Sequence, residues 1–300
     1  MFLQQLINGL TLGAVYALIA LGYTMVYGIL ELINFAHGEI YMLGAYISII
    51  TLTFLTVTGL TVESLFLSLF IAVIAAMLYC GAYGLTLERV AYRPLRHAPR
   101  LSPLISAIGM SIFLQNYVML AQGSADKIFP HTFSSVSIAM GDATFTYLQG
   151  FIIIASVILM IALQTFIRKT RLGKAMRATA QDKKMASLVG IDIDAVIVAT
   201  FIIGSVLAAA AGVMVAMYYG LVNFYIGYVA GIKAFTAAVL GGIGNIRGAV
   251  LGGFMLGILE SLGAGYISSE YKDAFAFIIL ILILIFKPAG LLGERVPEKV

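Results

Sequence analysis

The chain has 300 residues, of which 61% are hydrophobic and only 11% carry a charge. A soluble globular domain usually has about 25% charged residues, so this composition excludes one and indicates a polytopic membrane protein. The net charge of +4 then reflects topology, and we expect no binding of nucleic acid. Cys80 is the only cysteine, which excludes a disulfide within the chain and argues against a thiolate metal site.

Nine apolar segments are long enough, or nearly so, to cross a bilayer, for which about 20 residues are needed. They lie near residues 3–28, 38–58, 64–87, 101–121, 148–167, 193–218, 229–243, 248–267 and 270–286. We therefore predict an all-α polytopic membrane protein, in which residues 1–300 form one transmembrane domain. The expected architecture is a bundle of about 8–10 transmembrane helices.

The basic residues gather in two loops. One follows the third apolar segment and holds Arg89, Arg93, Arg96 and Arg100, and the other, residues 168–192, holds seven of the 18 Lys and Arg residues. Because Lys and Arg are enriched in cytoplasmic loops, both loops are predicted to face the cytoplasm. Counting segments from them places the stretch 122–147 and the N-terminus outside, and the C-terminus in the cytoplasm.

The segment 168–192 also carries the signals of a short, separate helix. Asp182 is a good N-cap, and Gly190 can supply a left-handed C-terminal cap. The residues between them give a short apolar face, made of Met185, Ala186, Leu188 and Val189. Asp194 is expected to cap the sixth apolar segment. An amphipathic helix held on anionic lipid is the alternative interpretation of this segment.

Glycines mark a close packing site in the eighth apolar segment. Gly248, Gly252 and Gly257 are predicted to lie largely along one helix face, where small residues let two backbones approach closely. The turn Asn34–Gly38 precedes a similar pair of small residues, Gly44 and Ala45, just as Gly252 and Gly253 follow the later turn. This arrangement suggests an internal repeat of the kind that transporters use.

Ionisable and amide groups within apolar segments are costly and usually face a cavity or a protein partner. His37 is expected to stabilise a turn near water, and Lys233 is expected to snorkel to the external headgroups. Gln115 and Asn116 either bond neighbouring helices or line a path. The candidate residues of a translocation path or gate are Asn34, His37, Gln115, Asn116 and Glu260.

No group of residues makes a catalytic constellation. The chain has no P-loop, and its one Gly-Lys pair, Gly173-Lys174, is followed by Ala175. The HExxH, CxxC and GxSxG motifs are missing as well. We therefore expect a chain that is not an enzyme and that binds no metal or cofactor of its own.

A resemblance to one family runs through nearly the whole chain. It is carried by the segments Thr11–Tyr46, Glu88–Arg96, Leu104–Asn116, Lys184–Ile191 and Lys233–Gly244. These segments are similar to those of the LivH family, the permease subunits of bacterial high-affinity branched-chain amino acid ABC importers. The external stretch 122–147 shows little resemblance.

The resemblance implies a multi-pass protein of the bacterial inner membrane and a complex of several subunits. The partners would be a second permease resembling LivM, two ATPase subunits resembling LivG and LivF that hold ATP and Mg, and a periplasmic amino-acid-binding protein. The capped helix resembles the coupling helix that seats in an ATPase subunit, with Asp182, Met185, Ala186, Leu188 and Gly190 as its coupling residues. The implied substrates are leucine, isoleucine and valine.

Three alternatives remain open on sequence alone. An ABC permease for another small solute, such as a sugar or a short amide, is the nearest alternative. An ion-coupled secondary carrier would need ligands for its coupling ion near the membrane midplane, and Glu260 and Gln115 are the candidates. A channel is also possible, although its filter would not be recognisable here.

Overall fold

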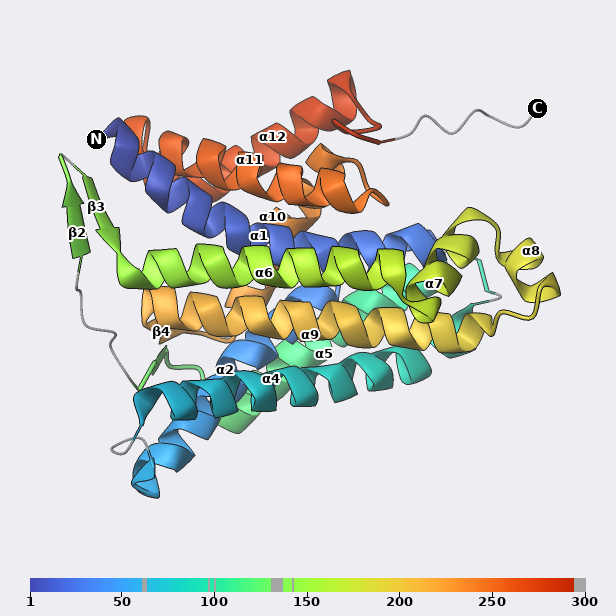
Figure 1. Cartoon of the computed structure of the whole chain (residues 1–300), viewed down its shortest axis with the longest axis horizontal. Helices are drawn as coiled ribbons and strands as arrows, with labels where there is room; N and C mark the ends of the chain where they lie inside the picture. The colour runs from blue at the N-terminus through green and yellow to red at the C-terminus, as the bar shows by residue number, and fades with distance from the viewer. Residues whose placement is uncertain (61–63, 97, 100, 131–136, 142, 294–300) are drawn as a thin grey trace.

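The computed structural model describes residues 1–60, 64–96, 98–99, 101–130, 137–141 and 143–293 (Figure 1). Its long helices are α1 (Phe2–Leu30), α2 (His37–Val57), α4 (Leu65–Leu87), α5 (Leu101–Gln122), α6 (Tyr147–Lys169), α9 (Ile193–Tyr219) and α11 (Ile246–Tyr266). The shorter ones are α7 (Arg171–Gln181), α8 (Lys183–Leu188), α10 (Ile226–Gly241) and α12 (Lys272–Phe286). A π-helical turn, Glu88–Tyr92, and a 3₁₀ turn, Arg93–Leu95, extend α4.

The predicted apolar segments correspond to helices α1, α2, α4, α5, α6, α9, α10, α11 and α12, with each boundary within three residues of the prediction. Among the described helices, seven are long and apolar enough to cross a membrane, whereas α10 is a shorter apolar helix of 16 residues. The predicted fold class, an all-α polytopic membrane protein, is confirmed. Arg100 and the tail from residue 294 lie outside the described residues.

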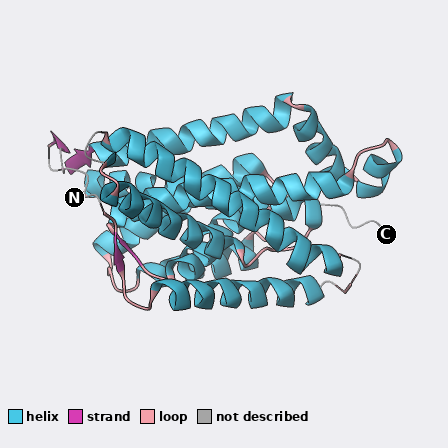
Figure 2. Ribbon diagram, turned by 90° about the horizontal axis from the view of Figure 1, so that it is seen from below, coloured by secondary structure: helices cyan, strands magenta, loops and turns pink. Residues whose placement is uncertain are grey.

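The bundle has two distinct ends (Figure 1). One end, here called the hairpin end, holds the N-terminus and the antiparallel hairpin of β2 (Ser137–Met140) and β3 (Ala143–Thr146). The opposite end, here called the α8 end, holds α7 and α8 (Figures 1 and 2). A second antiparallel pair, β1 (Lys127–Ile128) with β4 (Leu221–Val222), ties the stretch after α5 to the segment that follows α9.

Helices α1 and α9 form the centre of the bundle. In their most apolar stretches, 89% and 72% of the residues are buried, against 22% to 28% for α4, α5 and α6. A helix that is apolar on all sides must be enclosed by protein or by lipid. Helices α1 and α9 are therefore enclosed by protein, whereas α4, α5 and α6 present apolar side chains to the surroundings.

Close backbone contacts join α11 to two helices at once. Gly248 and Gly252 lie against Gly241 and Ala237 of α10. Gly257 lies instead against α1, at Gly13, and α1 and α11 run antiparallel there. All three glycines therefore lie at close helix contacts, but the prediction that they share one helix face is wrong. Five residues turn a helix by about 140°, so Gly252 and Gly257 point to different neighbours.

Replacing Gly252 by Leu should destabilise the fold, because a Cβ atom there would collide with the carbonyl oxygen of Ala237 and approach the Gly241 nitrogen to 2.7 Å. Overpacking a close contact costs about 1–3 kcal/mol and sometimes more. Thermal unfolding of the purified protein in detergent measures the change. Gly109→Leu on α5 is the matched control, since nothing lies within 4 Å of a Cβ atom at Gly109. Equal unfolding temperatures for the two variants would contradict the contact.

Candidate functional site

Helix α2 begins inside the bundle rather than at its surface. After α1 ends, Glu31 takes a left-handed conformation with φ of 59°, and residues 31–36 lead back to His37. The His37 side chain is 1% exposed, its ring centroid lies 4.9 Å from that of Tyr23, and it occupies the space beside Gly22. Gly22 is about two turns before the end of α1. The prediction that His37 lies near water is therefore wrong.

The turn before α2 is repeated before α10. Residues 31–38 read ELINFAHG, and residues 220–227, which lie 189 positions later, read GLVNFYIG. The structures agree as well: Gly220 has φ of 69°, the counterpart of Glu31, and α10 begins at Ile226, the counterpart of His37. The predicted repeat thus has its second copy at Asn223–Gly227, and the predicted match to the turn before Gly252 is wrong.

The two copies run in opposite directions. Helix α1 starts at the hairpin end, whereas α9 ends there (Figure 1). Each of the second helices packs against the first helix of the other copy, α2 against α9 and α10 against α1. Inverted repeats of this kind build many transporters, and their binding sites lie where the repeats meet.

The first turns of α2 and α10 meet directly. A Cβ atom at Gly38 would collide with the Gly227 carbonyl oxygen and with Gly231, and one at Gly227 would collide with the Glu39 carboxylate. That carboxylate accepts a hydrogen bond from the Ser111 hydroxyl of α5 at 3.0 Å. Close by in the chain, the buried Asn34 side chain accepts a hydrogen bond of 3.0 Å from the Tyr92 hydroxyl.

A second buried polar group lies toward the hairpin end and centres on Glu260 of α11. Its carboxylate is fully buried and lies 2.8 Å from the Lys233 ammonium and 3.4 Å from that of Lys272, and it accepts a 3.2 Å hydrogen bond from the Tyr16 hydroxyl. Lys233 also lies 2.5 Å from Asp273. The expected snorkelling of Lys233 is therefore wrong, because its charge is balanced inside the protein, as a buried charge requires.

The five candidate path residues do not form one cluster. Asn34 and His37 lie at the start of α2, and Glu260 belongs to the group just described. Asn116 lies on the exposed face of α5, where its amide donates back to the Ile112 carbonyl at 2.8 Å. Gln115 is half-buried. Among the polar side chains of α5, Ser111 is the one bonded to the centre.

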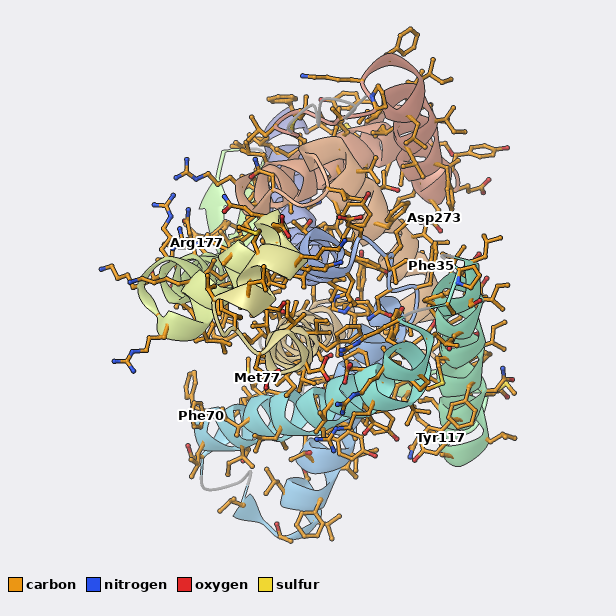
Figure 3. The ribbon with its side chains drawn as sticks, turned by 90° about the vertical axis from the view of Figure 1, so that its right-hand side faces the viewer. Phe35, Phe70, Met77, Tyr117, Arg177 and Asp273 are labelled. Atoms are coloured by element: carbon orange, nitrogen blue, oxygen red, sulfur yellow. The ribbon has the colours of Figure 1, made fainter. Side chains whose placement is uncertain are left out.

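The predicted capped helix is present as α8, and both predicted caps are confirmed. The Met185 amide donates to the Asp182 carboxylate at 3.0 Å, and Gly190 has φ of 85°. Ala186 is buried against its own chain, whereas Leu188 is 78% exposed and Met185 is also exposed. Seen from the α8 end, α7 carries several basic side chains, Arg177 among them, that point outward (Figure 3). The helix therefore presents apolar side chains beside a basic surface.

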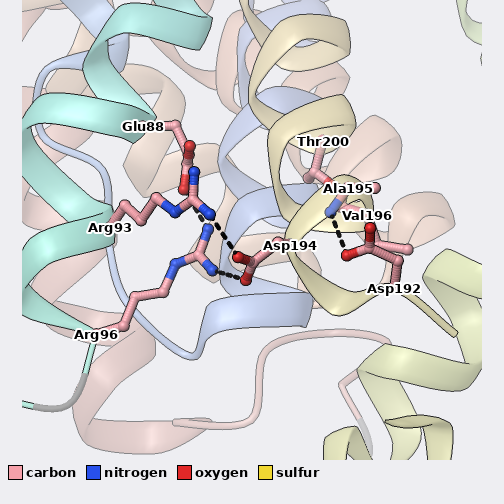
Figure 4. A network of polar contacts seen from close by, with 8 residues as sticks. All are labelled: Glu88, Arg93, Arg96, Asp192, Asp194, Ala195, Val196 and Thr200. Carbon is pink, nitrogen blue, oxygen red and sulfur yellow. Dashed lines mark hydrogen bonds and ion pairs between the residues drawn. The ribbon is translucent and has the colours of Figure 1, made fainter.

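An ionic network joins the end of α4 to the start of α9, close to α8 in the chain (Figure 4). Arg93 lies 2.9 Å from Asp194, and Arg96 pairs with both Asp194 and the fully buried Glu88. The N-cap of α9 is Asp192, which accepts a 3.0 Å hydrogen bond from the Ala195 amide. The prediction of Asp194 as the cap is therefore wrong, because its carboxylate is used by the two arginines.

Comparison with known proteins decides the family. Residues 5–284 match the family model described as the permease component of a branched-chain amino acid transport system. The chain belongs to this family. It is 52% identical to the permease protein LivH of Salmonella typhimurium and 52% identical to BraD of Pseudomonas aeruginosa, both named as high-affinity branched-chain amino acid transport proteins. Each alignment covers 100% of this chain and 98% of the relative.

A more distant relative shows how far the similarity extends. The permease is 27% identical to a probable LivH protein of Methanocaldococcus jannaschii, over 92% of this chain and 88% of that one. These relatives are named as permease proteins of transport systems, which fits a transport role for this chain. The family match over residues 5–284 includes both copies of the repeat.

Replacing Lys233 by Met should destabilise the permease, because the Glu260 carboxylate would lose its closest cation while remaining buried. Breaking a buried ion pair costs about 3–5 kcal/mol. The double variant K233M/E260Q should recover most of that loss, since no uncompensated charge remains. Thermal unfolding of both variants in detergent tests this expectation. A double variant that is no more stable than K233M would show that packing, and not charge, accounts for the loss.

Proposed function

We propose that this chain is a permease subunit of an ABC importer that moves leucine, isoleucine and valine across the bacterial inner membrane. The observation that carries the proposal is the 52% identity to LivH and BraD, which extends over the whole chain. The inverted repeat around Gly38 and Gly227 supports it, because such repeats give a membrane protein two alternative openings.

Transport in this proposal is driven by partner subunits. A second permease resembling LivM completes the route, a periplasmic binding protein delivers the amino acid, and subunits resembling LivG and LivF bind ATP and Mg. ATP binding and hydrolysis shift the permease pair between outward-open and inward-open states. The chain itself carries out no chemistry and needs no bound cofactor.

The orientation follows from charge. The basic loop after α4 and the basic segment 168–192 both belong to the α8 end, which is therefore assigned to the cytoplasm. The N-terminus and the β2–β3 hairpin then face the periplasm, and the C-terminus is cytoplasmic. The described residues 122–130, 137–141 and 143–147 lie on the periplasmic side in this assignment.

Helix α8 is the proposed site of ATPase docking. Met185 and Leu188 are exposed and apolar at the end assigned to the cytoplasm, so they are available to a protein groove. Asp182 and Gly190 fix the two ends of the helix. Ala186 seats α8 on the permease itself, and its proposed coupling role is therefore indirect.

The proposed route uses the meeting point of the repeats as its gate. Asn34 and His37 lie beside the contact of Gly38 with Gly227, so opening that contact would expose them to the substrate. Glu260 and its partners belong to the periplasmic approach. Gln115 and Asn116 lie toward the outside of α5, and they would reach the route only at an interface with the second permease.

Replacing Leu188 by Glu should abolish leucine uptake by the assembled importer while leaving membrane insertion unchanged. A carboxylate buried at a docking surface without a partner is strongly unfavourable. Uptake of radioactive leucine into proteoliposomes and co-purification of the ATPase subunits measure the two effects. The matched control is Gln181→Glu, which adds the same charge at an exposed position at the end of α7. Normal ATPase co-purification with Leu188→Glu would contradict the assignment of α8.

Reconstitution of the complete complex tests the function itself. Proteoliposomes that contain this permease, its permease partner and both ATPase subunits should take up leucine only with ATP and the loaded binding protein. Uptake driven by an ion gradient without ATP would favour the secondary carrier. ATP-dependent uptake of another solute, with none of the three amino acids, would favour a different ABC permease.

A further inference from the structure

A cavity of about 300 Å³ opens beside the buried carboxylate of Glu260. It is enclosed by α1, α2, α9, α10 and the start of α12, together with the segment that joins α9 to α10. Its volume is at the small end of the range for ligand pockets, about 300–1,000 Å³. A ligand of the size of a single amino acid fits such a space, whereas a sugar chain or a peptide does not.

The charged part of the wall carries both signs. Lys233, Lys272 and Asp273 line the cavity, and Glu260 lies beneath them, so two ammonium groups face two carboxylates. The Asp273 side chain is 57% exposed and that of Lys272 is 29% exposed. These two groups therefore remain accessible to a ligand while Lys233 and Glu260 hold each other in the interior.

This charge balance favours a zwitterionic ligand over one with a net charge. The four wall charges already balance, so a ligand with only an ammonium, or only a carboxylate, would add an uncompensated charge to a partly enclosed space, which is costly. A zwitterion can offer its ammonium to Asp273 and its carboxylate to Lys272, so every charge stays paired. Lys272 has donor capacity for this, because an ammonium carries three N–H groups.

The remaining wall is aliphatic and aromatic. Leu12, Val215, Ile226, Val229 and Ala230 line the cavity, along with tyrosines such as Tyr219 and Tyr225. Apolar walls with a few placed polar groups are the usual design of a small-molecule site. An apolar side chain on the ligand would gain about 25 cal/mol for each Å² that it removes from water.

We propose that this cavity is a substrate subsite of the permease, which takes a zwitterionic α-amino acid with an aliphatic side chain before the gate opens. The inference rests on the proposed function, because it places a site for the same class of substrate at the periplasmic approach. The α-ammonium group pairs with Asp273 and the α-carboxylate with Lys272. The aliphatic side chain packs against Val229 and Ala230.

A cysteine-protection experiment tests the subsite without ATP or the binding protein. Val229 is changed to Cys in a Cys80→Ala background, and the purified complex is treated with a polar thiol reagent. Leucine at millimolar concentration should slow the labelling several-fold. Neither 4-methylpentanoate, which lacks the ammonium, nor 3-methylbutylamine, which lacks the carboxylate, should do so. Ile226→Cys, which also lines the cavity, is the second reporter if the first variant does not fold.

Matched variants make the result specific. Tyr228→Cys, exposed and next to Val229 but outside the cavity lining, should be labelled at the same rate with and without leucine. Adding Asp273→Asn to Val229→Cys should remove the protection, whereas adding Glu270→Gln, a nearby exposed carboxylate outside the lining, should keep it.

The outcomes separate this inference from the proposed function. Absence of protection at both reporters, or equal protection by 4-methylpentanoate, would overturn the subsite even if the complete importer takes up leucine. Failure of the complete importer to take up any of the three amino acids would refute the proposed function, whatever the labelling shows. Protection by leucine that depends on Asp273 supports the subsite.

Discussion

The close contact between the first turns of α2 and α10 is the constraint on which the rest of the permease depends. Two helices can begin side by side within the bundle only if no side chain separates their backbones, and Gly38, Gly227 and Gly231 provide that condition. Their position obliges residues 31–36 and 220–225 to turn back into the protein. The long helices α1 and α9 then enclose both turns, which explains why these two helices are the most deeply buried of those that cross the bundle centre.

Charge is arranged around this apolar centre at two levels. Toward the hairpin end, Lys233 and Glu260 neutralise each other within the protein, and toward the α8 end Glu88 and Arg96 do the same. In both places a more exposed carboxylate, Asp273 or Asp194, completes the group. One network joins α10 to the next two helices, α11 and α12, and the other joins the end of α4 to α9, about 100 residues later. The networks therefore hold the outer helices to the repeats without crossing the centre.

The sequence predicted the local features well because each depends on neighbouring residues. Apolar run lengths located the membrane helices, and Asp182 with Gly190 located α8. It failed where the outcome depends on three-dimensional packing. Nothing in the local pattern of Lys233 reveals that Glu260 lies beside it. The five-residue spacing of Gly252 and Gly257 suggests one helix face, but in the structure these two glycines contact different helices. The second turn could have been predicted from the sequence, because Asn223–Gly227 has the same Asn-Phe-x-x-Gly pattern as Asn34–Gly38.

The antiparallel repeat has a mechanical consequence for the two faces of the membrane. Because α1–α2 and α9–α10 share one local design in opposite orientations, an exchange of conformations between the two copies would turn the arrangement at one face of the membrane into that at the other. The two end states would then be built from the same kinds of contact and would differ little in free energy. A small bias, supplied at one face, is sufficient to reverse such a balance.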